Sequence, residues 1–280
     1  MADARERLVR LRAGLLQWRP LPGRPDENLA TAVELIDRAG AAGCELVAMP
    51  ELWPCGYATE TLARDVRAAA EPLDGPRGRA LAERARGHRL WLAAGSVPEL
   101  ERGHRYNAAP LYDPEGRLVA RHRKVHRYAA GGEHDAFDAG RALTVCDTAL
   151  GPVGLTVCLD GDFPENARAL RERGVRLVVQ AAAYELAAEP WWSRLYPAAA
   201  LSNGQWWILV NQAGGGCFGR SMVVSPRGDV VAEAARVEAD DAVPNLLVVD
   251  LPFAAELDRA DAEAGVLFDD RPRPATVARV

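Results

Sequence analysis

The stretch Gly154-Leu155-Thr156-Val157-Cys158-Leu159-Asp160-Gly161-Asp162-Phe163-Pro164-Glu165 decides how the rest of the chain is interpreted. Residues 155–157 predict a short buried strand, because they follow a glycine and are apolar or β-branched. Asp160-Gly161-Asp162 is typical of a turn, and Pro164 followed by Glu165 favours the start of a helix. Cys158 is therefore expected where a strand ends and a helix is about to begin.

A cysteine at such a turn has two interpretations. The turn can present the side chain as a nucleophile, while nearby N–H groups and the helix dipole favour its thiolate form. Alternatively, Cys158 is a small hydrophobic residue that ends a core strand. Both interpretations remain open from this stretch alone.

Length and charge narrow the class of protein. The chain has 280 residues, enough for one large α/β domain or two small ones, and a formal net charge of -5. This mild acidity does not favour binding to nucleic acid or to an anionic membrane. The first seven residues are charged and lack the apolar core of a signal peptide, and no apolar run is long enough to span a membrane. We therefore expect a cytoplasmic location.

The five cysteines are scattered and form no Cys-x-x-Cys pair; they lie at positions 44, 55, 146, 158 and 217. Neither a zinc site nor a disulfide framework is indicated, so reduced thiols are expected. There is no cluster of metal ligands and no glycine-rich phosphate loop between a strand and a helix. The sequence thus predicts no metal and no cofactor.

Hydrophobic periodicity predicts strands that alternate with helices. Strands are expected at residues 8–18, 45–49, 90–96, 107–112, 118–122, 175–180, 206–211 and 245–250, with a hairpin at 221–232. Helices are expected from a cap at Asp26 to residue 39, at 76–86, at 165–173 and in a segment ending near 201. Residues 131–140 are expected to form an irregular surface loop. This pattern favours one α/β domain with both parallel and antiparallel strand pairs.

Three polar side chains lie at the ends of predicted strands. Glu51 and Cys158 follow apolar strands, and Lys124 ends another. Ligands of α/β sheets bind beyond the carboxyl ends of the strands, so these residues could converge on one cleft. Taken singly, Glu51, Lys124 and also Glu133 are equally consistent with solvated surface charges.

Together these residues resemble the three signatures of the nitrilase (carbon–nitrogen hydrolase) superfamily, in its amidase-like branch. The signatures are Pro50-Glu51 with Gly56-Tyr57, Arg123-Lys124-x-His126, and Cys158-x-Asp160 with Phe163-Pro164-Glu165. Their order and spacing match the family. Further similar elements are Tyr106-Asn107, residues 113–116, Glu133 with Phe137 and Gly140, and residues 221–228.

The resemblance implies a Glu-Lys-Cys triad. Cys158 would attack an amide-type carbon and form an acyl-thioester, with Glu51 as the general base. Lys124 and the backbone N–H of Leu159 would stabilise the oxyanion, and Glu133 would position the substrate and Lys124. Such a site needs no histidine, so the rival Cys–His mechanism of papain-like proteases is not favoured, and His122, His126 and His134 are expected in ordinary loop or core roles.

The resemblance also implies the architecture: an α/β fold, with an α-β-β-α sandwich of two mixed β-sheets between helical layers. We expect a single carbon–nitrogen hydrolase domain over residues 1–280. Residues 254–280 would form a C-terminal tail at the subunit interface of a homodimer or larger homo-oligomer.

The expected activity is hydrolysis of a non-peptide C–N bond in a small molecule, first a primary amide. The alternatives are an N-carbamoyl amine or amino-acid amidohydrolase, a nitrilase, and an acyltransferase that uses an amine instead of water. A non-catalytic relative would be expected to lack Glu51, Lys124 or Cys158, and all three are present.

Aromatic residues in loops after the relevant strands are candidates for the substrate pocket, or else for ordinary packing: Trp53, Tyr57, Tyr184, Trp191 and Trp192. Asp162 is most simply a turn residue near the start of a helix. Its alternative role is contact with a cationic substrate, such as an aminoalkyl or guanidinoalkyl amide.

Overall fold

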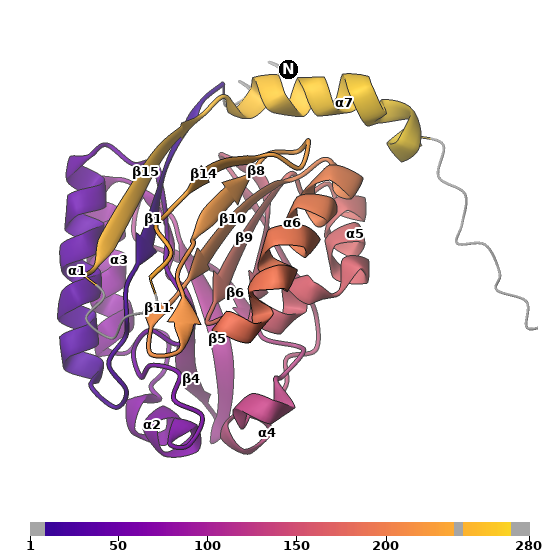
Figure 1. Ribbon diagram of the computed structural model, residues 1–280. Helices are drawn as coiled ribbons and strands as arrows, with labels where there is room; N and C mark the ends of the chain where they lie inside the picture. The colour runs from indigo at the N-terminus through magenta and orange to yellow at the C-terminus, as the bar shows by residue number, and fades with distance from the viewer. Residues whose placement is uncertain (1–8, 238–242, 270–280) are drawn as a thin grey trace, which may run out of the picture.

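Two main β-sheets lie face to face in the computed structural model, which describes residues 9–237 and 243–269 (Figure 1). The first sheet has the strand order β15-β1-β2-β3-β5-β4, with β6 paired to β5. Its strands are β1 (Leu11–Gln17), β2 (Leu46–Ala48), β3 (Trp91–Ala93), β4 (Val97–Glu101), β5 (His104–Tyr112), β6 (Leu118–Arg123) and β15 (Asn245–Leu251).

The second sheet has the order β14-β13-β10-β9-β8-β7. Its strands are β7 (Thr144–Thr148), β8 (Gly151–Val157), β9 (Leu177–Ala182), β10 (Trp206–Asn211), β13 (Met222–Val224) and β14 (Val230–Glu233). A separate short hairpin pairs β11 (Ala213–Gly214) with β12 (Cys217–Phe218).

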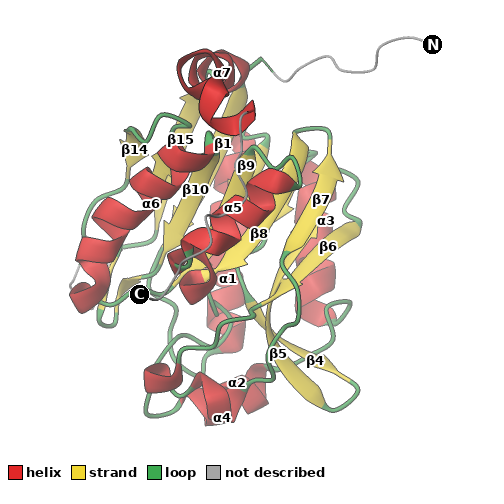
Figure 2. Ribbon diagram, turned by 90° about the vertical axis from the view of Figure 1, so that its right-hand side faces the viewer, coloured by secondary structure: helices red, strands yellow, loops and turns green. Residues whose placement is uncertain are grey.

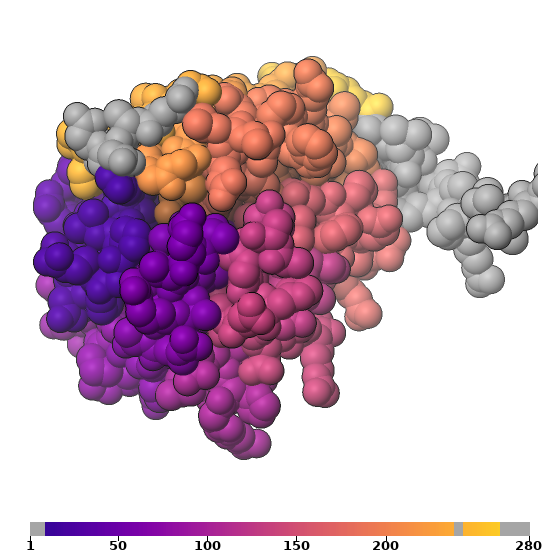
Figure 3. Space-filling model, turned by 60° about the horizontal axis from the view of Figure 1, so that its bottom comes forward, coloured from indigo at the N-terminus to yellow at the C-terminus, as the bar shows by residue number. Residues whose placement is uncertain are grey.

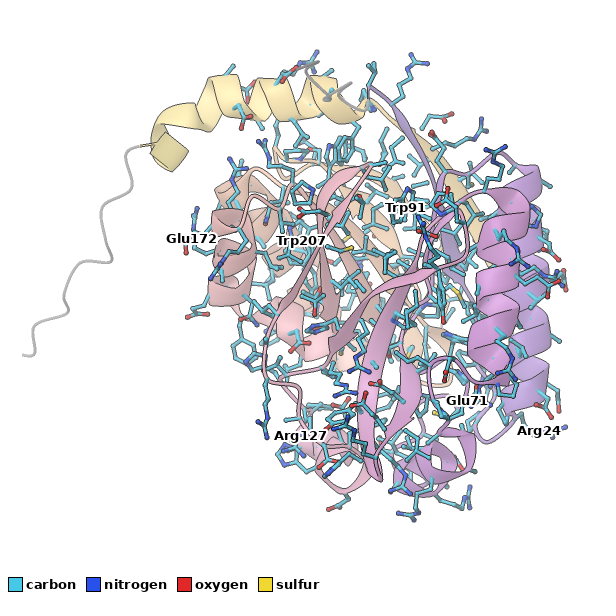
Figure 4. All side chains as sticks on the ribbon, turned by 180° about the vertical axis from the view of Figure 1, so that it is seen from behind. Arg24, Glu71, Trp91, Arg127, Glu172 and Trp207 are labelled. Carbon is cyan, nitrogen blue, oxygen red and sulfur yellow. The ribbon has the colours of Figure 1, made fainter. Side chains whose placement is uncertain are left out.

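Helices cover the outer face of each sheet. Helices α1 (Pro25–Ala41) and α3 (Pro76–His88) pack on the first sheet, and α5 (Pro164–Glu172) and α6 (Glu189–Asn203) pack on the second (Figure 2). One apolar core lies between the sheets and joins Leu15, Leu155 and Ile208, and a further core lies under each helical layer. Trp207, for example, faces the layer of α5 and α6 (Figure 4). The predicted α-β-β-α sandwich is confirmed.

Strand directions bring three loops to one end of the molecule. β2 runs parallel to β3, and β6 is antiparallel to β5, which is antiparallel to β3, so β2 and β6 end on the same side. The parallel strands β8 and β9 of the other sheet end there too, because the N–H of Glu51 donates to the carbonyl of Ala182 at 3.2 Å. The loops after β2, β6 and β8 therefore meet.

Two short helices close this end. They are α2 (Leu62–Ala69) and α4 (Glu133–Ala136), which share a small apolar core with Leu52 and Phe137. They lie at the bottom of Figure 1, and the view that brings this end forward shows their chain segments, purple and magenta, side by side (Figure 3).

Several predicted boundaries need correction. The first long helix begins at Pro25 with no side-chain cap, so Asp26 lies inside its first turn. Part of the predicted loop 131–140 is the helix α4, whose Glu133 is buried. The start of the first predicted strand, Leu8, lies outside the described residues.

The expected C-terminal tail is partly helical. Residues 254–269 belong to α7 (Phe253–Asp269), which lies across the top of Figure 1, and residues 270–280 lie outside the described residues. Leu257 of α7 packs against the core between the sheets. Within the part of the chain that the structure describes, no helix has the length and apolar character needed to cross a membrane.

Candidate active site

Cys158 lies at a strained turn. It is the first residue of a short 3-10 helix, Cys158–Asp162, directly after β8, and its φ is 48°. A non-glycine residue rarely adopts this left-handed conformation, and where it persists the surrounding structure must hold it. Gly161 in the same turn has no room for a side chain, since a Cβ there would come within 1.9 Å of the Gln180 Oε1 atom. Cys158 is 9% exposed and faces a cavity.

Glu51 is fully buried in the loop after β2. Its Oε1 atom accepts hydrogen bonds of 2.8 Å from the Asn107 amide and 2.8 Å from Lys124 Nζ. Its backbone carbonyl accepts a bond of 2.7 Å from the Gln212 amide, which fixes the loop to the second sheet. Its Oε2 atom has no hydrogen-bond partner among the described residues. A buried carboxylate oxygen without a donor is available to accept a proton.

Lys124 binds two carboxylates. Its Nζ atom lies 2.8 Å from Glu51 Oε1 and 2.6 Å from Glu133 Oε1, and all three side chains are buried. Glu133 is held in turn by the hydroxyl of Tyr57, at 2.9 Å, and by the N–H of Tyr128, at 2.9 Å. The structure thus brings Glu51, Lys124 and Glu133 together, with Glu133 buried where the sequence predicted a surface loop.

The charges of this cluster are set by burial and by one another. Burial raises the pKa of the Glu51 carboxyl, and the ammonium of Lys124 opposes this only in part. Burial alone would lower the pKa of Lys124, but the carboxylates of Glu51 and Glu133 outweigh it and hold that pKa well above its usual value. Lys124 therefore stays an ammonium at neutral pH.

The protonation state of the Cys158 thiol differs from the sequence-based expectation. Burial, and then the carboxylate of Glu51, raise the pKa of this thiol well above its usual value, and Lys124 lowers it only in part. The resting side chain is accordingly a neutral thiol, and the expectation that the turn favours a thiolate is wrong. A reaction at this sulfur needs a base beside it.

Asp160 joins the two loops that carry Lys124 and Cys158. Its buried carboxylate accepts bonds of 2.8 Å from His122 and 2.8 Å from His126, and it also accepts the N–H groups of Val125 and His126. Burial raises the pKa of Asp160, but the bonds from His122 and His126 outweigh it and leave the pKa below its usual value. Both histidines therefore serve to hold this aspartate.

A cavity of about 320 Å³ opens over Cys158. Of the predicted pocket residues, it is lined by Tyr57, Asp162, Tyr184 and Trp191, together with Cys158 and Leu159. Trp53 does not line it: its side chain is buried against Trp18, and its indole N–H donates to the carbonyl of Ala94. Trp192 is likewise buried, in the core under α6.

Sequence reasoning missed several residues of this cavity and its walls. Tyr128 and Glu185 line the cavity, and Tyr196 lies behind it and donates a bond of 2.8 Å to Asp162. Tyr184 also donates to Asp162. Burial raises the pKa of the Asp162 carboxyl, although both phenols favour its ionised form. Tyr128 lies only four residues after Lys124, and this closeness in sequence is the one local signal that could have indicated its place at the cavity.

The other cysteines lie outside this cavity. Cys44, Cys55 and Cys217 are buried and Cys146 is partly buried, and none of them forms a disulfide. In residues 9–237 and 243–269 there is no group of three or more His, Cys, Asp or Glu side chains arranged to hold a metal ion.

Comparison with known proteins places these features in a family. The family described as "Carbon-nitrogen hydrolase" matches residues 12–256. A nitrilase from Pyrococcus abyssi is 29% identical over 241 residues, which are 84% of this chain and 89% of that protein. A probable hydrolase, nit2, from Schizosaccharomyces pombe is 33% identical over 113 residues, 38% of this chain; the chain thus spans only 39% of that relative's length.

Solved structures are similar over nearly the whole chain. Saccharomyces cerevisiae Nit3, a member of branch 10 of the nitrilase superfamily, has a TM-score of 0.80 at 25% identity, covering 91% of this chain and 94% of that one. A mutant of the amidase from Nesterenkonia sp. AN1, another member of the superfamily, has a TM-score of 0.74 at 32% identity, covering 91% and 95% of the two chains.

Proposed function

The chain belongs to the carbon–nitrogen hydrolase family of the nitrilase superfamily, and we propose that it hydrolyses a primary amide of a small molecule to a carboxylate and ammonia. One observation carries the proposal: the buried ammonium of Lys124 is held between Glu51 and Glu133, beside Cys158 at the cavity. The amidase from Nesterenkonia supports it, because its active-site cysteine takes the acetamide moiety of fluoroacetamide covalently and another of its structures holds butyramide.

In the first step Glu51 acts as the general base. Its unpartnered Oε2 atom accepts the proton of the Cys158 thiol as the sulfur attacks the amide carbon. A C–S bond forms, and the π electrons of the carbonyl move to oxygen. The resulting oxyanion is stabilised by the Lys124 ammonium and the N–H of Leu159.

The intermediate then collapses to a thioester. Glu51 returns its proton to the amide nitrogen, the C–N bond breaks, and ammonia leaves. The acyl group remains on the sulfur of Cys158. Because the resting thiol is neutral, each turnover needs Glu51 to carry this proton from sulfur to nitrogen.

Water completes the cycle. Glu51 takes a proton from a water molecule, the oxygen adds to the thioester carbon, and Lys124 again faces the oxyanion. When the C–S bond breaks, the sulfur regains the proton from Glu51. The products are the carboxylic acid and the free enzyme, with Lys124 charged throughout.

The test is ammonia release from a panel of small amides, ureido acids and nitriles. The wild-type chain is expected to act on amides, and Cys158→Ala is expected to abolish release. Cys146→Ala is the matched control, since it removes a thiol that lies outside the cavity. Mass spectrometry of the wild type during turnover should show the acyl adduct on Cys158.

Other outcomes would contradict the proposal. Release that survives in Cys158→Ala overturns the nucleophile. Release from ureido acids or nitriles alone overturns the amide substrate while leaving the cysteine in place. Amide product formed only when an amine or hydroxylamine is added would identify an acyltransferase.

A further inference from the structure

The lining of the cavity is acidic and aromatic. Two of its side chains are carboxylates, Asp162 and Glu185, and four are aromatic: Tyr57, Tyr128, Tyr184 and Trp191. None of the described residues that line it is Lys, Arg or His. At its base the charged groups nearest to Cys158 include Lys124, but Glu51 and Glu133 together outnumber it. The surroundings of a bound molecule are therefore negative.

Asp162 is fixed in position within the cavity. It lies in the same short helix as Cys158, and its Oδ1 atom accepts bonds from the hydroxyls of Tyr184 and Tyr196. Those two hydroxyls lie 2.8 Å apart, and the Tyr196 hydroxyl also accepts a bond from the Gln180 amide at 2.5 Å. A carboxylate held in this way cannot swing out to solvent when a ligand enters. Only Oδ1 is used by these tyrosines, which leaves Oδ2 for a ligand.

The outer part of the cavity is more open. Trp191 is 58% exposed, Tyr128 is 42% exposed, and Glu185 is also exposed. Aromatic faces attract cations, and they do so more strongly where water is excluded. Such a rim beside a carboxylate is suited to an ammonium or guanidinium group.

On the basis of the amidase function proposed above, we propose that this cavity selects amides whose acyl chain carries a cationic amine or guanidinium group. The amide carbon would lie at Cys158, and the cation would lie against Asp162 and the aromatic side chains. An amide that carries a carboxylate instead would face Asp162 and Glu185, and repulsion between like charges disfavours it.

A hollow next to this acidic cavity contains a basic residue. It has a volume of about 240 Å³ and includes Arg19, but Tyr57 and Glu185 line both hollows and stand between them. An anionic group would have to pass these two residues to reach Arg19. Preference for an anionic amide would therefore indicate that the second hollow, and not the first, determines specificity.

The experiment compares three amides with six carbon atoms each: ε-aminocaproamide, caproamide and adipamic acid, which are cationic, neutral and anionic. We expect kcat/KM to fall in that order, with roughly tenfold between cationic and neutral amides, equivalent to about 1.4 kcal/mol. In Asp162→Asn the ratio of cationic to neutral kcat/KM should fall severalfold towards one, because the asparagine still accepts the tyrosine hydrogen bonds but carries no charge. The matched control is Glu83→Gln, an exposed carboxylate of α3, which should leave the ratio unchanged.

Binding to Cys158→Ala separates this inference from the proposed function. Calorimetry with that variant should rank the three amides in the same order without turnover, and Cys158→Ala/Asp162→Asn should show a weaker preference for the cationic amide. An equal or stronger affinity for adipamic acid overturns the inference, as does a ratio that Asp162→Asn leaves unchanged. If the order of binding holds but the wild type releases no ammonia, the amidase function fails and the cation site stands.

Discussion

At the scale of single residues, the site depends on an ammonium that no other basic residue type could replace. Lys124 is the one lysine of the sequence, and the other 33 of its 34 lysine and arginine residues are arginine. Its compact Nζ atom fits between Glu51 and Glu133 at 2.8 and 2.6 Å. A guanidinium is planar, larger and donates in a fixed fork, so it cannot occupy this position without displacing one carboxylate.

The first prediction concerns replacement of this lysine. Lys124→Arg keeps the charge but should lower kcat/KM by at least about a hundredfold, because the donor no longer reaches the oxyanion. Lys124→Met should in addition lower the free energy of unfolding by about 3 kcal/mol, since it leaves Glu51 and Glu133 buried without a cation. Ammonia release and urea denaturation measure the two effects. An active Lys124→Arg variant would show that charge alone is sufficient.

The second prediction concerns pH. Because burial raises the pKa of Glu51, kcat/KM should fall on the acid side with an apparent pKa above that of an ordinary glutamate. The pKa of Lys124 is also raised, so no loss from its deprotonation is expected at mildly alkaline pH. Nitrogen-15 labelling of lysine would give a single side-chain signal, which should remain that of an ammonium beyond the pH at which free lysine titrates. Titration of that signal below this pH would contradict the ion-pair cluster.

At the scale of elements, the site is a junction of loops from both sheets. Glu51 follows β2 and Lys124 follows β6 of the first sheet, while Cys158 follows β8 of the second. Asp160 spans the junction, since it accepts N–H groups from the loop after β6 and lies in the turn after β8. Arg127 strengthens the same end by donating to the carbonyl of Phe137, and it lies at the lower end of Figure 4.

The third prediction tests this junction. Asp160→Asn should lower the free energy of unfolding by about 2 kcal/mol, because charged hydrogen bonds to His122 and His126 are lost, and should also lower kcat. Asp113→Asn is the control: this buried aspartate similarly accepts backbone N–H groups, in the hairpin between β5 and β6, but it does not line the cavity. It should lose stability and keep kcat. Equal loss of kcat in both variants would mean a general effect of destabilisation.

The carboxylate of Asp160 also makes the free energy of unfolding depend on pH. The pKa of Asp160 is lowered in the folded state. The contribution of Asp160 to the free energy of unfolding is therefore fully present above the pKa of an unfolded aspartate, and it is lost as the pH falls through the folded-state pKa. The difference in stability between the wild type and Asp160→Asn should therefore shrink on acidification.

At the scale of the whole molecule, the outer surface of α6 remains apolar in part. Leu201 of this helix is 54% exposed, and it does not line the cavity over Cys158. An exposed leucine on a helix of the outer layer is compatible with a subunit interface, where apolar side chains become buried. This agrees with the expected homodimer or larger assembly, which stays a prediction. The single domain over residues 1–280 and the place of residues 254–280 at the interface also stay predictions.

The fourth prediction concerns this assembly. Light scattering should give at least twice the chain mass of 30.2 kDa. Leu201→Glu should shift the mass towards that of one chain, because it places a charge on the expected interface, whereas Leu21→Glu in the exposed loop before α1 should not. A mass of one chain at every concentration for the wild type would contradict the expected assembly.

The sequence by itself determined the features that depend on neighbouring residues. The strand, turn and helix start around Cys158 are coded within a dozen positions, and the strand at residues 206–211 was predicted with its observed bounds. Periodicity and turn chemistry act over such short distances, so they can be read along the chain. The signatures at Glu51, Lys124 and Cys158 likewise indicated the family.

Only the tertiary structure decided which charges are buried and what they touch. The local pattern predicted Glu133 in a surface loop, although the family resemblance implied that it positions Lys124; the structure buries it against Lys124 and Tyr57, the latter 76 residues away. Trp53, a candidate for the pocket, belongs to the core, whereas Tyr128 and Glu185 line the cavity. The protonated state of the Cys158 thiol has the same origin, because burial and the distant carboxylate of Glu51 set its pKa. Such effects depend on separations in space between residues far apart in sequence, and local patterns do not contain them.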